Sequence, residues 1–416
     1  MPVALSDRDR ALLGGGSGEG AAFAMRLVVG AAEAVGAPRL IDISGAHVDS
    51  CLYHGEASID FVERLVAGGA RVSVPTTLNV GALDLMHPGL WRGEPAVAER
   101  GRLLMDRYRT LGCRATYTCA PYQLPWARPR LGEQVAWAES NAIVFCNSVL
   151  GARTNRYGDF IDVACAITGR APDAGLHRDE GRRARLVLQL ADDVPRDSLL
   201  PSLLGIALGR HAGSSVAAIE GLPADLGEDG LKAIGAAAAS SGSVAMFHAV
   251  GLTPEAPTLA SALDGAEPVA TETITLAELR AIREELSAAA DPGALRAVAI
   301  GTPHASVAEL REVERLLAGR RPAVQLVVSM ARDLAGAEPD LVERLEAAGI
   351  TLLFDTCSYV SPVLGGDGGT VMTDSGKWAF YAPATVGAAP LIGSTADCVE
   401  SAVAGRVVRG SSAWDA

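Results

Sequence analysis

The chain has little or nothing of several features, and each shortage excludes a class of protein. It contains only two lysines, Lys232 and Lys377, and carries a formal net charge of -13, which argues against nucleic acid and anionic membranes as partners. No run of about 18 uncharged apolar residues occurs, so we expect no membrane-spanning helix. The N-terminus reaches charged residues almost at once, so we expect no secretory signal.

Common catalytic and cofactor motifs are also missing. The sequence has no G-x-S-x-G, no H-E-x-x-H, no C-x-x-C and no dinucleotide-binding fingerprint. The Gly-rich run at 14–20 lacks the lysine of a phosphate-binding loop, and we interpret it as a flexible entry loop. Seven scattered cysteines do not resemble a disulfide framework. They fit a reducing, cytoplasmic setting in which some thiols are able to bind metal.

What remains is the composition of a folded α/β protein. Hydrophobic residues make up 49% and charged residues 20% of 416 residues, enough for a large core in two or three subdomains. A compositional break near 190–200 suggests two domains, 1–195 and 196–416. Apolar patterns predict these helices and strands in the first of them: helices at 21–36 and 58–69; strands at 39–44, 71–77, 115–119 and 141–148. Alternation of strand, helix and strand predicts parallel pairing.

The C-terminal third alternates most clearly between strands and helices. Strands are predicted at 295–301, 322–330 and 350–357, and helices at 307–319 and 339–349. Ser306 and Glu309 form the pattern of a capping box before the first of these helices. Thr275 and Glu278 form the same pattern before a helix at 276–286. Two further strands are predicted at 184–190 and 241–251.

Polar side chains follow most of the predicted strands. Ligands of parallel sheets bind beyond the carboxyl ends of the strands, so we expect these side chains to gather at one edge. The alternative is that such loops are polar anyway. We expect catalytic roles for Ser44, His47, His304 and Asp355, and substrate-binding roles for Thr76, Thr77, Asn79, Asn147 and Ser148.

Three cysteines also lie at predicted strand ends. Thiolates of Cys119, Cys146 and Cys357 could ligate iron, because soft sulfur ligands select such centres. The alternative is that each is a small buried hydrophobic residue, the usual state of cysteine outside disulfides. We expect that state for the other four cysteines.

Two segments offer groups for an anionic substrate. Ser375, Gly376 and Lys377 lie on a predicted loop after a Gly-rich run, where a backbone amide and an ammonium could bind a carboxylate or phosphate. Arg153, beside Thr154, could pair with a substrate carboxylate. The alternatives are a solvent-exposed loop for Lys377 and a surface turn for Arg153.

Taken in order, these segments resemble one family. The motifs are ISGAHV, VPTTLN, YTCAPY, ESNAIVFCNSVLGARTNR, GLHRDEGRRA, GTPHASVAEL, DTCSYVSPV and TDSGKWAFYAP, and they follow the order seen in aconitase X over about residues 10–405. The resemblance implies an α/β fold, an aconitase-like large subunit with several parallel-sheet subdomains around a central cleft. It also implies that the small swivelling domain is absent from this chain and is supplied by a separate small subunit.

The resemblance further implies an iron-dependent dehydratase of a small hydroxy acid. The implied reaction is that of cis-3-hydroxy-L-proline to Δ1-pyrroline-2-carboxylate, with a 5-phosphomevalonate dehydratase-type large subunit as the alternative. A non-catalytic binding subunit is the alternative from another class. Cys119 and Cys357 match ligand-type positions, and Cys146 is a third candidate for holding a two-iron, two-sulfur cluster or mononuclear iron. Thr302 stands where many members carry cysteine, which argues against a four-iron site. The catalytic base is expected from the partner subunit.

Overall fold

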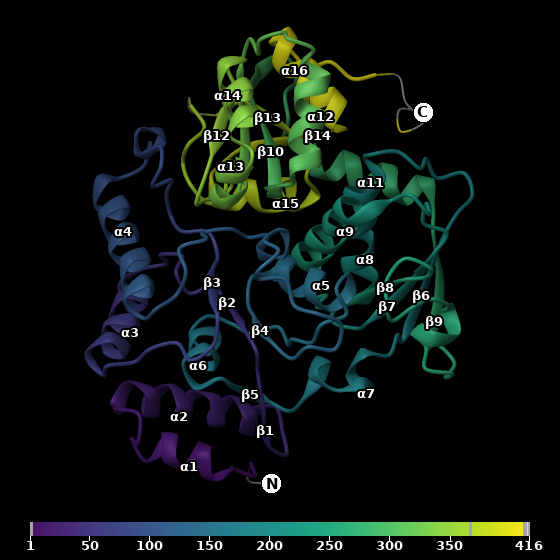
Figure 1. The fold of residues 1–416 in the computed structure, drawn as a ribbon. Coiled ribbons are helices and arrows are strands. Elements are labelled where there is room, and N and C mark those ends of the chain that lie inside the picture. Colours follow the sequence, from purple (N-terminus) through teal and green to yellow (C-terminus); the bar gives the residue numbers. More distant parts are fainter. Residues whose placement is uncertain (1–2, 366–367, 411–413, 415–416) are drawn as a thin grey trace. The chain divides into compact units, whose positions relative to one another are not determined.

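A computed structural model describes residues 3–365, 368–410 and 414 of the chain. It contains two compact units, each with helices around short sheets (Figure 1), so the predicted α/β class is confirmed. The first unit joins Met1–Leu83 to Glu94–Arg183, and the second joins Asp84–Gly93 to Ala184–Ala416. The division in the main chain therefore falls after Arg183, whereas the sequence suggested residue 195.

The first unit consists mostly of helices and short strands. Its described elements are α1 (Asp7–Leu13), α2 (Glu19–Ala34), β1 (Leu40–Asp42), β2 (Ala46–Val48), α3 (Glu56–Ala67), β3 (Thr76–Leu78), α4 (Pro95–Thr110), η2 (Pro121–Gln123), β4 (Ala136–Trp137), α5 (Ser140–Ser148), α6 (Ile161–Thr168), β5 (Arg170–Pro172), η3 (Gly175–His177) and α7 (Asp179–Arg182).

The predicted βαβ unit exists, but its first strand is β2 and not the segment 39–44. Strands β3, β2 and β4 form one parallel sheet in the order β3-β2-β4, with α3 connecting β2 to β3. Segment 39–44 instead contains β1, which pairs antiparallel with β5. Both segments are short and apolar, and sequence pattern alone does not say which of them pairs with β3.

Two further predicted strands are wrong. Residues 141–148 form helix α5, whose first turn is capped by the Glu139 carboxylate accepting a hydrogen bond from the Ala142 N–H at 2.8 Å. All residues of α5 after its first are buried, so no polar face revealed the helical period. Segment 115–119 is no strand either: the Thr116 hydroxyl takes the ladder position and bonds the Leu78 N–H and C=O at 2.9 Å.

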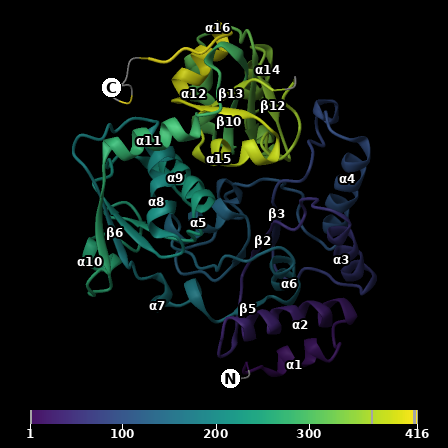
Figure 2. The ribbon, with the colours of Figure 1, turned by 180° about the vertical axis from the view of Figure 1, so that it is seen from behind.

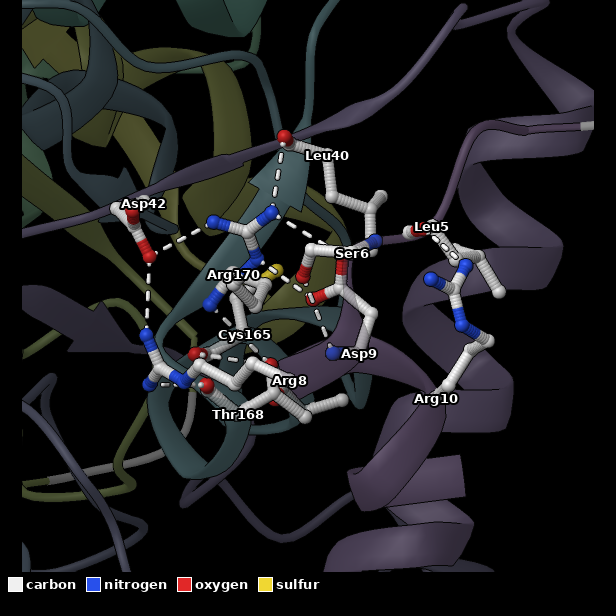
Figure 3. Close-up of polar contacts among 11 residues, drawn as sticks. Leu5, Ser6, Arg8, Asp9, Arg10, Leu40, Asp42, Cys165, Thr168 and Arg170 are labelled. Carbon is white, nitrogen blue, oxygen red and sulfur yellow. Dashed lines mark hydrogen bonds and ion pairs between the residues drawn. The ribbon is translucent and has the colours of Figure 1, made fainter. Parts of the chain in front are cut away.

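A buried ion pair fixes helix α1 to strand β5 (Figure 3). The Asp9 carboxylate is fully buried and accepts hydrogen bonds from Arg170 Nε at 2.9 Å and Nη2 at 3.2 Å. Arg170 also donates to the carbonyl oxygen of Leu40 at 3.0 Å. Burial by itself would raise the pKa of Asp9, but the hydrogen bonds from Ser6 and Arg170 lower it overall. This ion pair therefore joins the first helix of the unit to a strand near the end of the unit's sequence.

The second unit contains two parallel sheets. Its described elements are η1 (Pro88–Leu90), β6 (Leu186–Leu190), α8 (Leu200–Ala212), β7 (Ala217–Glu220), α9 (Gly227–Ser241), β8 (Phe247–Ala249), α10 (Leu259–Ala262), β9 (Ala270–Ile274), α11 (Leu276–Leu286), η4 (Pro292–Ala294), β10 (Leu295–Ala305), α12 (Val307–Leu317), β11 (Gln325–Met330), α13 (Arg332–Ala337), α14 (Pro339–Ala347), β12 (Thr351–Leu353), β13 (Thr370–Thr373), α15 (Gly376–Thr385), β14 (Ala389–Ile392) and α16 (Thr395–Ala404).

The larger sheet has the order β12-β11-β10-β13-β14, with every pair parallel. Alternate side chains of β10 pack on opposite faces of the sheet. Val298 and Ile300 pack with helices α12, α14 and α16, whereas Ala297 and Ala299 pack with Trp378 of α15. Figure 2 shows this sheet from behind, with α12, α14 and α16 gathered around it. The predicted strands and helices of the C-terminal third are all present.

The predicted capping box of α12 is confirmed. The Ser306 hydroxyl accepts from the Glu309 N–H at 3.2 Å, and the Glu309 carboxylate accepts from the Ser306 N–H at 2.8 Å. At α11 the Thr275 hydroxyl caps the Glu278 N–H. Among the described residues, no helix combines the length and apolar character needed to cross a membrane.

We predict that Arg170→Ala lowers the free energy of unfolding by about 3 kcal/mol or more, because it leaves the buried Asp9 carboxylate without its partner. Urea unfolding at neutral pH measures this. Since the pKa of Asp9 is lowered in the fold, this stabilisation is present above the ordinary aspartate range and is lost as acid protonates Asp9. The gap between variant and wild type should therefore shrink at low pH.

Arg8→Ala is the matched control. Arg8 pairs with Asp42 at 3.0 Å, but both side chains are more than half exposed, so the loss should stay below about 1 kcal/mol. Equal losses for Arg8 and Arg170 would contradict a special role for the buried pair.

Candidate active site

Two donors for a metal lie near the carboxyl ends of β10 and β12 in the second unit. The Sγ atom of Cys357 and a ring nitrogen of His304 lie within 4.8 Å of each other, and both side chains are fully buried. His304 Nε2 lies 3.0 Å from the carbonyl oxygen of Thr356, so Nε2 carries the proton and Nδ1 the lone pair. Thiolate and imidazole are ligands that iron accepts, so these two residues fit the expected metal.

The loop between β12 and Cys357 is held by Asp355. This carboxylate is fully buried and accepts two hydrogen bonds from the Arg332 guanidinium, from Nε to Oδ1 at 2.5 Å and from Nη2 to Oδ2. It also accepts the Leu85 N–H at 3.1 Å. Burial raises the pKa of Asp355 above its ordinary range, and the Arg332 charge opposes that shift. With both oxygens occupied, Asp355 is arranged to position the loop that carries Cys357.

Ser375, Gly376 and Lys377 begin helix α15. The Ser375 hydroxyl accepts from the Trp378 N–H at 3.0 Å and donates to the carbonyl oxygen of Thr302. Lys377 is 2% exposed, with its ammonium 5.7 Å from the centre of the Tyr359 ring. The expectation that these residues form a loop is therefore wrong, and so is the alternative of a solvent-exposed lysine. A buried ammonium is costly unless something compensates it.

A cavity of about 380 Å³ opens where β10 and β13 end. These neighbouring strands form the switch point of the sheet, where chain connections leave in opposite directions and ligands usually bind. Thr302 and Ser375 line the cavity together with Lys232. Lys232 is buried and pairs with Asp229 at 2.9 Å and Glu309 at 2.5 Å. Both lysines of the chain are therefore buried inside this unit.

In the first unit, His47 is a buried neutral imidazole. It pairs in register with Thr77 on β3 and Trp137 on β4, and its Nδ1 lies 2.8 Å from the Thr77 hydroxyl. Burial lowers the pKa of His47 to about 3. Its Nε2 has no hydrogen-bond partner among the residues that the structure describes. At this pKa the ring binds a proton only weakly near pH 7, so burial favours a neutral hydrogen-bonding role for His47 over that of a catalytic base.

Ser44 and Asn79 lie at opposite ends of the sheet β3-β2-β4. Asn79 directly follows β3, at its carboxyl end, whereas Ser44 precedes β2, at its amino end. The Ser44 hydroxyl donates to Glu133 at 2.5 Å, and Ser44 lines a cavity of about 240 Å³ with Thr77. The expectation of a single edge is therefore wrong for Ser44, because the strand begins at Ala46. Thr76 is buried and donates to the carbonyl oxygen of Val74 at 2.9 Å.

The segment from Asn147 to Thr154 is tied into the first unit by hydrogen bonds. Asn147 Oδ1 accepts from the Thr154 N–H and from Arg182, both at 3.0 Å. The Thr154 hydroxyl accepts from the Trp137 N–H at 2.9 Å. Arg153 pairs with Asp179, and Ser148 is buried at the end of α5. These contacts give the segment a structural role beside any role in binding.

Cys119 and Cys146 differ in their surroundings. Cys146 lies within α5 in an apolar cluster with Phe145, and burial raises the pKa of its thiol well above the ordinary range. Cys119 is also buried, but it lies in a loop whose Tyr117 has a φ of 41°, a strained value for a residue with a side chain. Strained loops of this kind cluster at functional sites, so Cys119 fits a ligand role better than Cys146 does.

Sequence reasoning missed three charged residues that follow strands. Arg332 follows β11, Asp49 follows β2 and Glu139 follows β4. The rule that ligand-binding side chains follow the carboxyl ends of parallel strands would also have found these three residues. It failed at Asp49 and Glu139 because the short strands before them, β2 and β4, were not predicted as strands.

Family models match nearly the whole chain. The first, second and third domains of aconitase X match residues 2–180, 184–284 and 295–404. The chain is also similar to a crystal structure of Thermococcus kodakaraensis aconitase X in its holo form, with a TM-score of 0.86 and 32% identity. That match covers 96% of this chain and 100% of the other.

Three characterised relatives show how similarity is distributed. The chain is 44% identical to a cis-3-hydroxy-L-proline dehydratase of Pseudomonas aeruginosa, over 98% of this chain and 71% of that protein. The Hypocrea jecorina protein of the same name is 42% identical, over 97% and 69%. A phosphomevalonate dehydratase large subunit of Methanosarcina mazei is 32% identical, over 97% and 98%.

We predict that Arg332→Ala lowers the free energy of unfolding by about 3 kcal/mol, because Asp355 is then a buried carboxylate without its guanidinium partner. Chemical denaturation measures the loss. Arg311→Ala is the control: Arg311 pairs with Glu338 at 3.1 Å on the surface, and its removal should cost less than about 1 kcal/mol. A negligible loss at Arg332 would show that Asp355 does not depend on this pair.

Proposed function

The chain belongs to the aconitase X family, and we propose that it is the iron-dependent large subunit of a cis-3-hydroxy-L-proline dehydratase. Its relatives are dehydratases, which are hydro-lyases, so the expectation of a lyase is confirmed. The observation that carries the proposed substrate is the 44% identity to the Pseudomonas aeruginosa enzyme over 98% of this chain. Identity to the phosphomevalonate dehydratase large subunit of Methanosarcina mazei is 32%.

The proposed reaction removes a proton from C2 and hydroxide from C3 of the ring. The enamine that forms then tautomerises to Δ1-pyrroline-2-carboxylate. Iron, when bound, supplies a Lewis acid for the departing hydroxide. A base must take the C2 proton, and the partner subunit is its proposed source. Burial keeps the pKa of His47 at about 3, which makes His47 a weak base and supports a base from the partner.

We propose His304 and Cys357 as iron ligands of the second unit. Their donor atoms are close and fully buried, and the Thr356 carbonyl fixes the tautomer that leaves Nδ1 as the donor. The family resemblance assigns a thiolate role also to Cys119 of the first unit. We propose a two-iron, two-sulfur cluster or mononuclear iron, since Thr302 replaces the cysteine that a four-iron site would use. The seven buried cysteines fit a reducing cytoplasm.

A small swivelling-domain subunit is the proposed partner. This chain covers 98% of a relative named a large subunit but 71% of the Pseudomonas aeruginosa relative. The 32% identity to that large subunit supports a second candidate function, dehydration of 5-phosphomevalonate. The two functions differ in the charge of the substrate, a property that binding experiments can separate.

We predict that Cys357→Ser and His304→Ala each lose bound iron while the fold is retained. Serine and alanine remove the thiolate and imidazole donors, respectively, from a site whose backbone is held by Asp355 and Arg332. Iron content and the visible absorption of anaerobically purified protein measure the loss, and circular dichroism checks the fold. Cys398→Ser is the control, since Cys398 is a buried core residue of α16. Wild-type iron content in both variants would make these residues structural.

We predict that this chain dehydrates cis-3-hydroxy-L-proline only when its small partner is present. Closure by a second subunit excludes water and completes the catalytic groups, so mixing the two should raise turnover by orders of magnitude. The assay follows Δ1-pyrroline-2-carboxylate, with 5-phosphomevalonate as the competing substrate. Full turnover by the isolated chain would reject the two-subunit proposal. An iron-free, inactive complex would favour a binding subunit.

A further inference from the structure

Three polar residues follow three neighbouring parallel strands of the first unit. Asp49 comes directly after β2, Asn79 directly after β3, and Glu139 two residues after β4. The strands still run together here: the Asn79 N–H donates to the Val48 carbonyl at 2.8 Å, and the Ala138 N–H donates to the His47 carbonyl at 2.9 Å. The three residues therefore share the carboxyl edge of one sheet, the usual ligand position.

Asp49 and Asn79 also share one face of that sheet. His47, Thr77 and Trp137 form a row across β2, β3 and β4 by register. Side chains two residues apart along a strand point to the same side. Asp49 and Asn79 are the next residues along that face, one step beyond the buried imidazole of His47, whereas Glu139 has a φ of 65° and caps helix α5.

Asn79 carries a buried side-chain oxygen that no described residue uses. Its side chain is 3% exposed, and its Nδ2 donates to the Asp49 carboxylate. Its Oδ1 has no hydrogen-bond partner within the described part of the chain. An amide oxygen buried without a donor costs free energy, so the position favours a ligand that brings an N–H or O–H group.

The charge around Asp49 specifies what kind of donor fits. Desolvation, followed by the carboxylates of Asp159, Glu139 and Asp162, raises the pKa of Asp49 to about 8. Asp162 already accepts the Asp49 N–H at 2.7 Å and the Ser50 N–H at 3.1 Å. Asp49 itself is partly exposed, so a ligand can reach it. A group of carboxyls held this close favours a cation over an anion.

We propose that Asp49 and Asn79 bind the ring ammonium of an amino acid substrate, with one N–H donated to the Asp49 carboxylate and the other to Asn79 Oδ1. This inference rests on the proposed function, because the secondary ammonium of cis-3-hydroxy-L-proline has two N–H donors. 5-Phosphomevalonate has no amine and carries a phosphate, which the carboxyl group cluster repels. Asp49 is thus the residue that selects between the two candidate substrates.

The test uses the iron-loaded complex with its small subunit and two probes of one shape. L-Proline has the ammonium, and tetrahydrofuran-2-carboxylate has a ring oxygen in its place. Asp49→Asn should weaken L-proline binding by about tenfold or more, the expected effect of losing a charged hydrogen-bond partner. Binding of the oxygen analogue should stay within about twofold. Calorimetric titration measures both affinities.

Asp60→Asn is the control, because Asp60 is an exposed carboxylate of α3 in the same unit. Asn79→Ala is the second variant: it keeps the Asp49 carboxyl group and should also weaken L-proline binding selectively. Unchanged L-proline affinity, or equal losses for both probes, overturns the inference. A wild-type complex that dehydrates cis-3-hydroxy-L-proline while Asp49→Asn keeps its KM leaves the proposed function standing and removes only the inference. Turnover of 5-phosphomevalonate alone rejects the proposed function itself.

Discussion

Parallel pairing of β10 with both β11 and β13 is the constraint on which the second unit depends. It places β10 in the centre of the five-stranded sheet and buries both of its faces, which requires apolar side chains at consecutive positions. It also brings the ends of β10 and β13 together at the switch point, where the cavity lined by Thr302 and Ser375 opens. Gly301 has a φ of 85° beside the Ser329 carbonyl, an approach that a Cβ atom would block.

Three buried charges of the described residues are held by ion pairs. Asp9 with Arg170 holds the first helix, Asp355 with Arg332 holds the loop of Cys357, and Lys232 lies between two carboxylates. Asp49 differs from these groups, since the charged neighbours that raise its pKa are carboxylates like itself. This contrast, together with the unused Asn79 oxygen beside Asp49, is the physical reason for treating Asp49 as a binding group, since clustered carboxyl groups gain free energy from a cation supplied by a ligand.

Long strands were easier to predict from the sequence than short ones. β10 spans eleven residues, and its apolar run was readable as a strand from the sequence alone. β2 and β4 have three and two residues and leave almost no periodic signal. His304 lies within long strand β10 and was found, whereas Asp49 and Glu139 follow two short strands that the sequence pattern did not reveal.

The sequence by itself determined the α/β class, the alternation of the C-terminal third, the capping box of α12 and the motifs that mark the family, because these depend on local pattern and residue order. Only the tertiary structure decided that α5 is a helix, that β1 pairs antiparallel with β5, and that Lys377 is buried. The physical reason is burial on all sides. A fully buried helix and a fully buried strand present the same apolar run, and the packing of distant segments chooses between them. The same packing leaves the Asn79 oxygen unsatisfied beside Asp49, a property that belongs to the folded sheet and to neither residue alone.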